Sequence, residues 1–234
     1  IPQEERCVGT SEFIEKKCLI PAVSKQLETR LQTGCAELGL ELVPSQTALL
    51  LEYINLLLKW NKVYNLTAVR DPAEMVVRHL LDSLAIAPWC TAKRFIDVGT
   101  GGGLPGVPLA ILYPDKEIHL LDSNSKKTRF LFQVKTALGL DNISVHHARV
   151  ESFTPIAPYD AVLSRAFASL VDMVANCGHL LIESGQFLAM KGSLDELELA
   201  GVKALGYIAT AYPLGVPGLD EQRHLVILSG KKCG

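Results

Sequence analysis

The chain has 234 residues, 48% of them hydrophobic, which is enough to bury an α/β core as one domain with an extension. Its formal net charge of -2 and pI near 6.3 exclude a globally basic protein, so any phosphate contact must come from local patches. No apolar run approaches the ~20 residues of a membrane span, and the N-terminal segment lacks the order of a secretory signal. We therefore expect a cytoplasmic protein that makes no membrane contact.

The cysteines indicate neither a disulfide framework nor a metal site. They form no C-x-x-C pair, and none has a histidine at the spacing of a zinc ligand. We expect reduced thiols and no metal. The six are Cys7, Cys18, Cys35, Cys90, Cys177 and Cys233.

The first third of the chain is predicted to be helical, because apolar residues recur three and four positions apart. Ser45 is expected to cap the second helix, and Pro72 suits the first turn of the third. The helices are predicted at residues 21–40, 48–60 and 72–86. We expect residues 21–73 to form a helical extension. Residues 1–20, which do not begin with Met, are expected to be disordered or foreign to the fold.

From Arg94 onward, short apolar runs alternate with helical periods, which is typical of a parallel sheet with crossover helices. Strands are predicted at residues 94–98, 117–121, 143–146, 161–163 and 186–190. A helix at 193–200 follows, and segments 207–212 and 223–228 indicate an antiparallel hairpin. The pattern predicts an α/β domain over 74–234, with a doubly wound, mostly parallel seven-stranded sheet.

The turn after the first strand carries two overlapping glycine patterns that predict different ligands. Gly101, Gly103 and Gly106 satisfy G-x-G-x-x-G, which seats a pyrophosphate on a helix N-terminus in dehydrogenases. Asp97, Gly99, Gly101 and Gly103 satisfy D-x-G-x-G-x-G, the pattern of methyltransferases. Five glycines within eight residues exceed what a tight turn requires.

Two observations favour the methyltransferase pattern. Asp97 supplies a carboxylate for the ammonium group of a methionine moiety. Pro105 and Pro108 suit the first turn of the next helix but remove N–H donors that a pyrophosphate would use. We therefore predict S-adenosylmethionine as the cofactor and the class I S-adenosylmethionine-dependent methyltransferase fold.

Residues at the ends of the second and third predicted strands extend this predicted site. Asp122, at the end of the second strand, can accept both ribose hydroxyls of a nucleoside, or alternatively cap the following helix. Val150 and Glu151 follow the third strand, where they would frame the adenine unless they form a solvated loop.

The chain resembles the glucose-inhibited division protein B family, also called ribosomal RNA small-subunit methyltransferase G, over roughly residues 49–228. The segments that carry the resemblance are 61–67 (NKVYNLT), 78–84 (RHLLDSL), the glycine loop, 164–168 (SRAFA) and 190–192 (MKG). Gly102 stands where the family often has proline. The other glycines of the loop are present in this chain.

The resemblance implies methylation of a guanine N7 in 16S ribosomal RNA, with S-adenosylmethionine as the donor. The implied partner is that RNA or the assembled small subunit, and we expect the protein itself to be a monomer. By the resemblance, the cofactor contacts are Gly99, Leu104, Val150, Glu151 and Arg165.

The end of the fourth strand bears on the nucleophile. The segment Ser164-Arg165-Ala166-Phe167 lacks the N/D-P-P-Y/F motif of exocyclic-amine methyltransferases, and no Pro-Cys or Thr-Cys pair offers a thiolate. Guanine N7 has a free lone pair and needs no general base, so positioning would carry most of the catalysis. Arg165 can hold the guanine edge and Phe167 can stack on the ring; alternatively, Arg165 contacts the cofactor, pairs with Asp97 or Asp122, or forms a buried salt bridge.

Polar residues before the sheet and after the second strand are expected to face RNA, although capping, packing and solvated surface are alternatives. They are Asn61, Asn65, Arg70, Arg78, His79, Lys126, Lys127, Arg129 and Lys191. Two other functions remain open from the residues alone: a nicotinamide-dependent oxidoreductase that uses the G-x-G-x-x-G pattern, and a non-catalytic nucleotide- or RNA-binding module.

Overall fold

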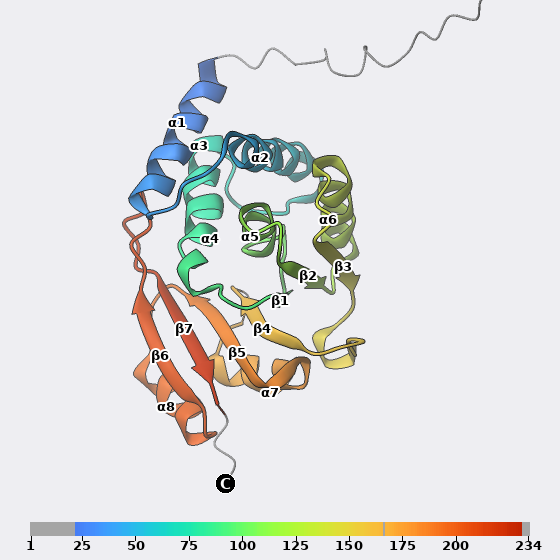
Figure 1. The fold of residues 1–234 in the computed structure, drawn as a ribbon, viewed down its shortest axis with the longest axis vertical. Coiled ribbons are helices and arrows are strands. Elements are labelled where there is room, and N and C mark those ends of the chain that lie inside the picture. The colour runs from blue at the N-terminus through green and yellow to red at the C-terminus, as the bar shows by residue number, and fades with distance from the viewer. Residues whose placement is uncertain (1–21, 166, 231–234) are drawn as a thin grey trace, which may run out of the picture.

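The computed structural model describes residues 22–165 and 167–230, with residues 22–24 described by backbone alone. A seven-stranded sheet lies at the centre of this part of the chain (Figure 1). The strands are β1 (Arg94–Val98), β2 (Glu117–Asp122), β3 (Ile143–His147), β4 (Tyr159–Ser164), β5 (Leu181–Lys191), β6 (Ile208–Pro213) and β7 (His224–Ser229). Their order is β3-β2-β1-β4-β5-β7-β6. Residues 1–20, which we expected to lie outside the fold, are outside the described residues.

The sheet confirms the predicted doubly wound topology. Strands β1 to β5 are mutually parallel, and the strand order reverses at β1, with β2 on one side and β4 on the other. β7 inserts between β5 and β6 and is antiparallel to both, so the predicted hairpin is confirmed. β1 is buried along nearly its whole length, as expected for a central strand covered on both faces.

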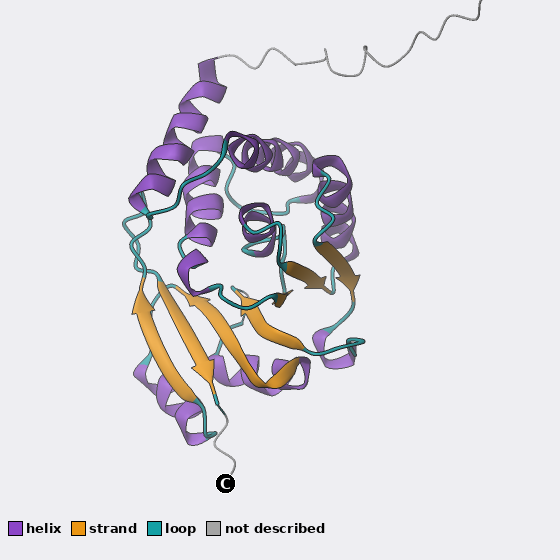
Figure 2. Ribbon diagram, viewed as in Figure 1, coloured by secondary structure: helices purple, strands orange, loops and turns teal. Residues whose placement is uncertain are grey.

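Helices cover both faces of the sheet (Figure 2). One apolar core joins its first face to α1 (Ala22–Glu37), α2 (Pro44–Tyr64), α5 (Gly106–Leu112) and α6 (Ser125–Leu138). A second core joins the other face to α7 (Leu170–Cys177) and α8 (Glu196–Ala204). The three short 3₁₀ segments are η2 (Ala87–Trp89), η3 (Val150–Ser152) and η4 (Gly178–Leu180).

The N-terminal helices share their core with the sheet domain. Leu50, Tyr53 and Leu57 of α2 are fully buried. The predicted N-cap at Ser45 is wrong: α2 begins at Pro44, with Val43 as its N-cap residue. The Gln46 side chain accepts a hydrogen bond from Val43 N–H and donates to the carbonyls of Ile111 and Leu112, which fixes the start of α2 against the end of α5.

The third predicted helix is a composite. It runs from α3 (Pro72–Met75) through a π-helical turn, η1 (Val76–Leu81), into α4 (Asp82–Leu84). Asp71, which precedes Pro72, caps it by accepting a hydrogen bond from Glu74 N–H. A π-turn inside a helix often marks a functional site, and this one carries Arg78 and His79.

Within the described ranges, no helix is both long and apolar enough to cross a membrane, and no group of His, Cys, Asp and Glu could hold a metal ion. Cys35, Cys90 and Cys177 are free and buried. Burial raises the pKa of Cys35 to about 11 and those of Cys90 and Cys177 to about 12, so these thiols are protonated and poorly nucleophilic.

Gly106, at the start of α5, tests the packing of this helix against β1 and β2. A β-carbon there would overlap the Leu120 side chain and lie 2.9 Å from Asp97 Oδ2. We expect Gly106→Ala to lower the free energy of unfolding by roughly 1–3 kcal/mol, measured by urea denaturation. Gly215→Ala is the matched control, because no atom lies within 4 Å of its added carbon. Equal stability of the two variants would contradict the proposed tight contact.

Candidate active site

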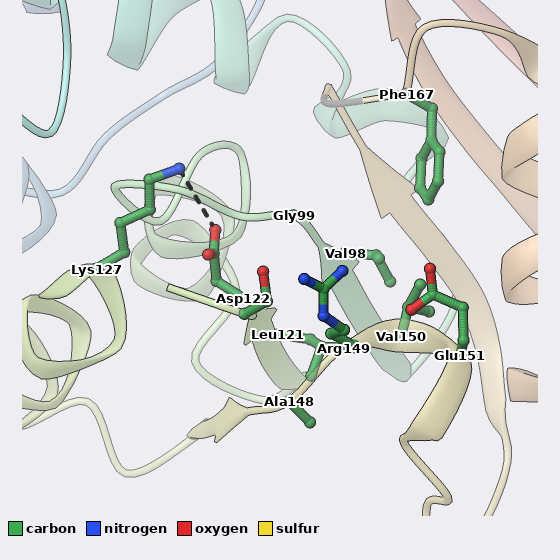
Figure 3. Close-up of a pocket in the computed structure, with 11 residues that line it drawn as sticks. Val98, Gly99, Leu121, Asp122, Lys127, Ala148, Arg149, Val150, Glu151 and Phe167 are labelled. Carbon is green, nitrogen blue, oxygen red and sulfur yellow. Dashed lines mark ion pairs between the residues drawn. The ribbon is translucent and has the colours of Figure 1, made fainter. Parts of the chain in front are cut away.

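A cavity of about 320 Å³ opens at the carboxyl ends of the parallel strands (Figure 3). Val98 of β1, Gly99 directly after it, Asp122 of β2 and Phe167 after β4 line it, together with the segment that follows β3. Ligands in doubly wound sheets bind at this edge, where the strand order reverses. The volume falls within the range of small-molecule sites.

The glycine loop has a conformation that requires glycine. Gly99, Gly101 and Gly103 have φ values of 68°, 61° and 97°, a region that other residues rarely adopt. Below the loop, Asp97 Oδ2 accepts hydrogen bonds from Thr100 Oγ1 at 2.7 Å and from Gly106 N at 2.9 Å. The carboxylate therefore ties both ends of the loop to β1.

The first turn of α5 has no donor left for a phosphate. Gly106 N–H donates to Asp97, Val107 N–H donates to the Gly103 carbonyl at 2.7 Å, and Pro108 has no N–H. Pro105 is the N-cap residue of α5, so its predicted place in the first turn is wrong, whereas Pro108 lies there as expected. This arrangement removes the seat that a dinucleotide pyrophosphate would use.

The Asp97 side chain is fully buried, and among the described residues its Oδ1 has no hydrogen-bond partner. Burial raises its pKa to about 6, although the bonds from Thr100 and Gly106 and the charge of Arg165 act in the opposite direction. A cation placed beside Oδ1 would supply the missing partner. Asp97 itself is not among the residues that line the cavity.

Asp122 faces the cavity and is fixed by its neighbours. Its Oδ2 accepts from Gly101 N–H at 2.9 Å, and its Oδ1 accepts from Asn124 N–H at 2.8 Å. Lys127 Nζ lies 3.7 Å from Oδ2 (Figure 3). Asn124 caps α6, so the alternative role of Asp122 as that helix cap is wrong. Each carboxylate oxygen keeps a lone pair for a ligand hydroxyl.

The segment after β3 forms one wall of the cavity. Val150 and Glu151 lie there at the start of η3, as predicted. Three other lining residues, Ser123, Ala148 and Arg149, were not predicted from the sequence. The Arg149 side chain reaches toward the space between Asp122 and Glu151 (Figure 3). The positions of these three residues directly after β2 and β3 were the available signal. Leu104 is 9% exposed, belongs to the core and does not line the cavity.

Arg165 pairs with Asp82 and not with Asp97 or Asp122. Its Nη1 lies 3.0 Å from Asp82 Oδ2, and Arg223 Nε lies 3.1 Å from Oδ1 of the same carboxylate. The Asp82 side chain is 4% exposed; burial raises its pKa, and the two guanidinium groups oppose that effect. Asp82 occurs within the 78–84 segment, but the sequence alone assigned it no role.

Two of the residues expected to face RNA are buried, so that expectation is wrong for them. His79 is 4% exposed, its Nε2 lies 2.9 Å from Thr67 Oγ1, and burial lowers its pKa to about 4. Asn61 is 3% exposed and binds Thr67 N–H and the Val69 carbonyl. Both residues hold the loop that joins α2 to α3.

Internal partners occupy three more of these residues. Lys191 donates to the Ala168 carbonyl and pairs with Glu198 at 3.0 Å, with 15% of its side chain exposed. Arg78 pairs with Glu74 and Glu221. Lys127 lies beside Asp122. The remaining residues are exposed: Asn65 and Arg70, which bond to each other at 3.0 Å, and Lys126 and Arg129.

Sequence comparison assigns the family. A family profile described as "rRNA small subunit methyltransferase G" matches residues 46–226. The chain belongs to this family. Proteins of that name from Pseudomonas syringae pv. syringae (strain B728a) and Cellvibrio japonicus (strain Ueda107) are each 51% identical, over 206 and 211 residues; each comparison covers 88% of this chain and 96% of the relative.

Solved structures support the class I methyltransferase fold. A putative O-methyltransferase from Klebsiella pneumoniae aligns with a TM-score of 0.56 and 14% identity, over 90% of this chain and all of that one. An O-methyltransferase from Bacillus cereus, solved in complex with S-adenosylhomocysteine (SAH), aligns with a TM-score of 0.55 and 14% identity, over 76% and 90% of the two chains. These likenesses concern the fold alone.

The unpartnered Oδ1 of Asp97 leads us to expect that ligand affinity depends on pH. If a ligand ammonium requires the ionised carboxylate, then affinity for SAH falls as pH drops through about 6, the pKa of Asp97. We expect binding to be about fourfold weaker at pH 5.5 than at pH 7.5, measured by isothermal titration calorimetry. Asp97→Asn should bind weakly and lose this pH dependence. Wild-type affinity that is constant between these pH values would argue against the role of Asp97.

Proposed function

We propose that this protein methylates N7 of a guanine in 16S ribosomal RNA, with S-adenosylmethionine as the methyl donor. The observation that carries the proposal is the cavity beside the glycine loop, built around Asp122, in a chain of the rRNA small subunit methyltransferase G family. The nicotinamide alternative finds no support, because the first turn of α5 has no free donor for a pyrophosphate.

The residues of the site fit S-adenosylmethionine. The Asp122 carboxylate faces the cavity and can accept the ribose hydroxyls, while Val150 supplies an apolar contact for the adenine beside Glu151. Asp97 Oδ1, buried and without a described partner, suits the methionine ammonium group. The positive φ angles of Gly99 and Gly101 let the backbone pass close to the ligand.

The chain's contribution to catalysis is positioning. When bound, S-adenosylmethionine supplies a methyl group activated by a sulfonium centre. Arg165 is held by Asp82 and can donate to guanine O6, which leaves the N7 lone pair free to attack in line. Phe167, in the cavity lining, can stack on the base and hold its plane. No proton is removed from N7, so no general base is required.

Further proposals concern the setting of the reaction. We propose that the enzyme acts in the cytoplasm as a monomer, on 16S RNA or the assembled small subunit. A chain with a net charge of -2 gains little general attraction to RNA, so an assembled particle, which offers shape and protein contacts, suits it as a substrate. Asn65, Arg70, Lys126 and Arg129 are the exposed candidates for RNA contact.

The test is methyl transfer from labelled S-adenosylmethionine to small subunits from cells that lack the enzyme. We expect one N7-methylguanine per particle, located by borohydride-dependent strand scission of the 16S RNA. Asp122→Asn should lower kcat/KM for the donor by roughly 10–100-fold, because a charged hydrogen bond to the nucleoside is lost. Lys203→Gln, on α8 across the sheet, is a control expected to behave as wild type. A labelled base other than guanine, or SAH binding without methyl transfer, refutes the substrate assignment.

A further inference from the structure

A second hollow lies on the outer surface where α2 meets α6. Its lining residues are Leu56, Lys59, Trp60, Val63, Tyr64 and Gln133, and its volume is about 400 Å³. We call it the α2–α6 groove. Val63 is 69% exposed and Tyr64 is 40% exposed, although both are large apolar or aromatic residues. A surface of this kind commonly marks an interaction site.

Aromatic rings link this groove to the glycine loop. Tyr64 packs on Trp60 with ring centroids 5.2 Å apart, and Trp60 packs on Phe130 at 5.7 Å. Phe130 in turn lies 6.3 Å from Tyr53, whose hydroxyl donates to the Gly102 carbonyl at 2.7 Å. Tyr53 and Tyr64 are about 16 Å apart along the axis of α2. A chain of packed aromatic rings in the core therefore connects the groove to the glycine loop.

The charge of the two segments that form the groove is entirely positive. Residues 53–70 contain Lys59, Lys62 and Arg70 but no acidic residue. Residues 123–140 contain Lys126, Lys127, Arg129 and Lys135 but no acidic residue, in a chain whose net charge is -2. This concentration of positive charge is local and not a property of the whole surface.

Several of these cations are available to a partner. Lys59, Lys62, Lys126 and Arg129 are exposed, and none forms an ion pair with the described residues. Lys127 and Lys135 instead contact Asp122 and the Ile143 carbonyl. An exposed ring, Tyr64, and the partly exposed ring of Trp60, flanked by unpaired cations, match single-stranded nucleic acid, because bases stack on rings and phosphates pair with cations. A protein-docking surface, in contrast, is usually depleted of lysine.

We propose that the α2–α6 groove binds an unpaired segment of the RNA substrate next to the guanine that enters the active site. A base stacks on the Trp60 and Tyr64 pair, and Lys59 and Arg129 bind the flanking phosphates. The rigid contact of Tyr53 with Gly102 fixes the distance between this docking point and the cofactor loop. This proposal rests on the proposed function, since it assumes an RNA substrate.

Tryptophan fluorescence tests the groove without an activity assay. The chain has two tryptophans, and Trp89→Phe leaves Trp60 as the sole reporter. We expect a single-stranded RNA oligonucleotide with the sequence around the methylated guanine to quench Trp60. Tyr64→Ala in this background should weaken binding roughly tenfold, while Tyr64→Phe keeps it, because stacking on the ring is what matters. RNA that binds without quenching Trp60 overturns the proposal.

The cation contribution is tested by salt dependence. Lys59→Gln should reduce the slope of log affinity against log salt by roughly 1, and Lys203→Gln on the opposite face should leave it unchanged. Equal slopes for the two variants overturn the phosphate contact. If Tyr64→Ala weakens binding to assembled subunits but not to protein-free RNA, the groove docks a ribosomal protein and the proposal is wrong.

Methyl-transfer assays separate this proposal from the proposed function. Quenching of Trp60 by RNA without any N7-methylguanine product leaves the groove intact and refutes the function. Methylation with a wild-type KM for RNA in both Tyr64→Ala and Lys59→Gln refutes the groove and leaves the function intact. Affinity for SAH, measured by calorimetry, should be the same in wild type and both variants.

Discussion

The buried carboxylate of Asp97 is the interaction on which the site depends. One of its oxygens accepts from Thr100 and Gly106, so it fixes the glycine loop at both ends and occupies the N–H of the first residue of α5. The other oxygen is left without a described partner. A carboxylate buried this way is costly unless a cation completes it, and the raised pKa reflects that cost. The same residue thus shapes the loop and favours a cationic ligand over a pyrophosphate.

The N-terminal helices contribute directly to the site. α2 belongs to the same apolar core as the sheet, and Tyr53 from its buried face donates a hydrogen bond to the Gly102 carbonyl in the glycine loop. η1 and α4 bring Asp82 to Arg165, so the position of a residue after β4 is set by a segment that precedes the sheet. These helices therefore pack against the sheet and also hold two parts of the site, the glycine loop through Tyr53 and Arg165 through Asp82.

The sequence predicted the features with strong local signals. Burial on both faces gives parallel strands continuous apolar runs, and closely spaced glycines after a strand predict a turn with positive φ angles, so the sheet and the loop were predictable. The hydrogen-bond and ion-pair partners of single side chains were not predictable, because they depend on which residues the fold brings together. His79 and Asn61 resemble polar surface residues in the sequence but turn inward to hold the α2–α3 loop. Asp82 and Arg165 lie far apart in the chain, and only folding brings them together.

We expect the glycine loop to bind a methionine-bearing nucleoside and not a dinucleotide. Calorimetric titration of the wild-type protein with SAH and, separately, with NAD tests this expectation, because the two ligands share an adenosine, whereas only SAH carries an ammonium group and only NAD carries a pyrophosphate. Saturable binding of SAH and no measurable heat with NAD at the same concentrations are the expected results. Binding of NAD as tight as that of SAH would contradict it.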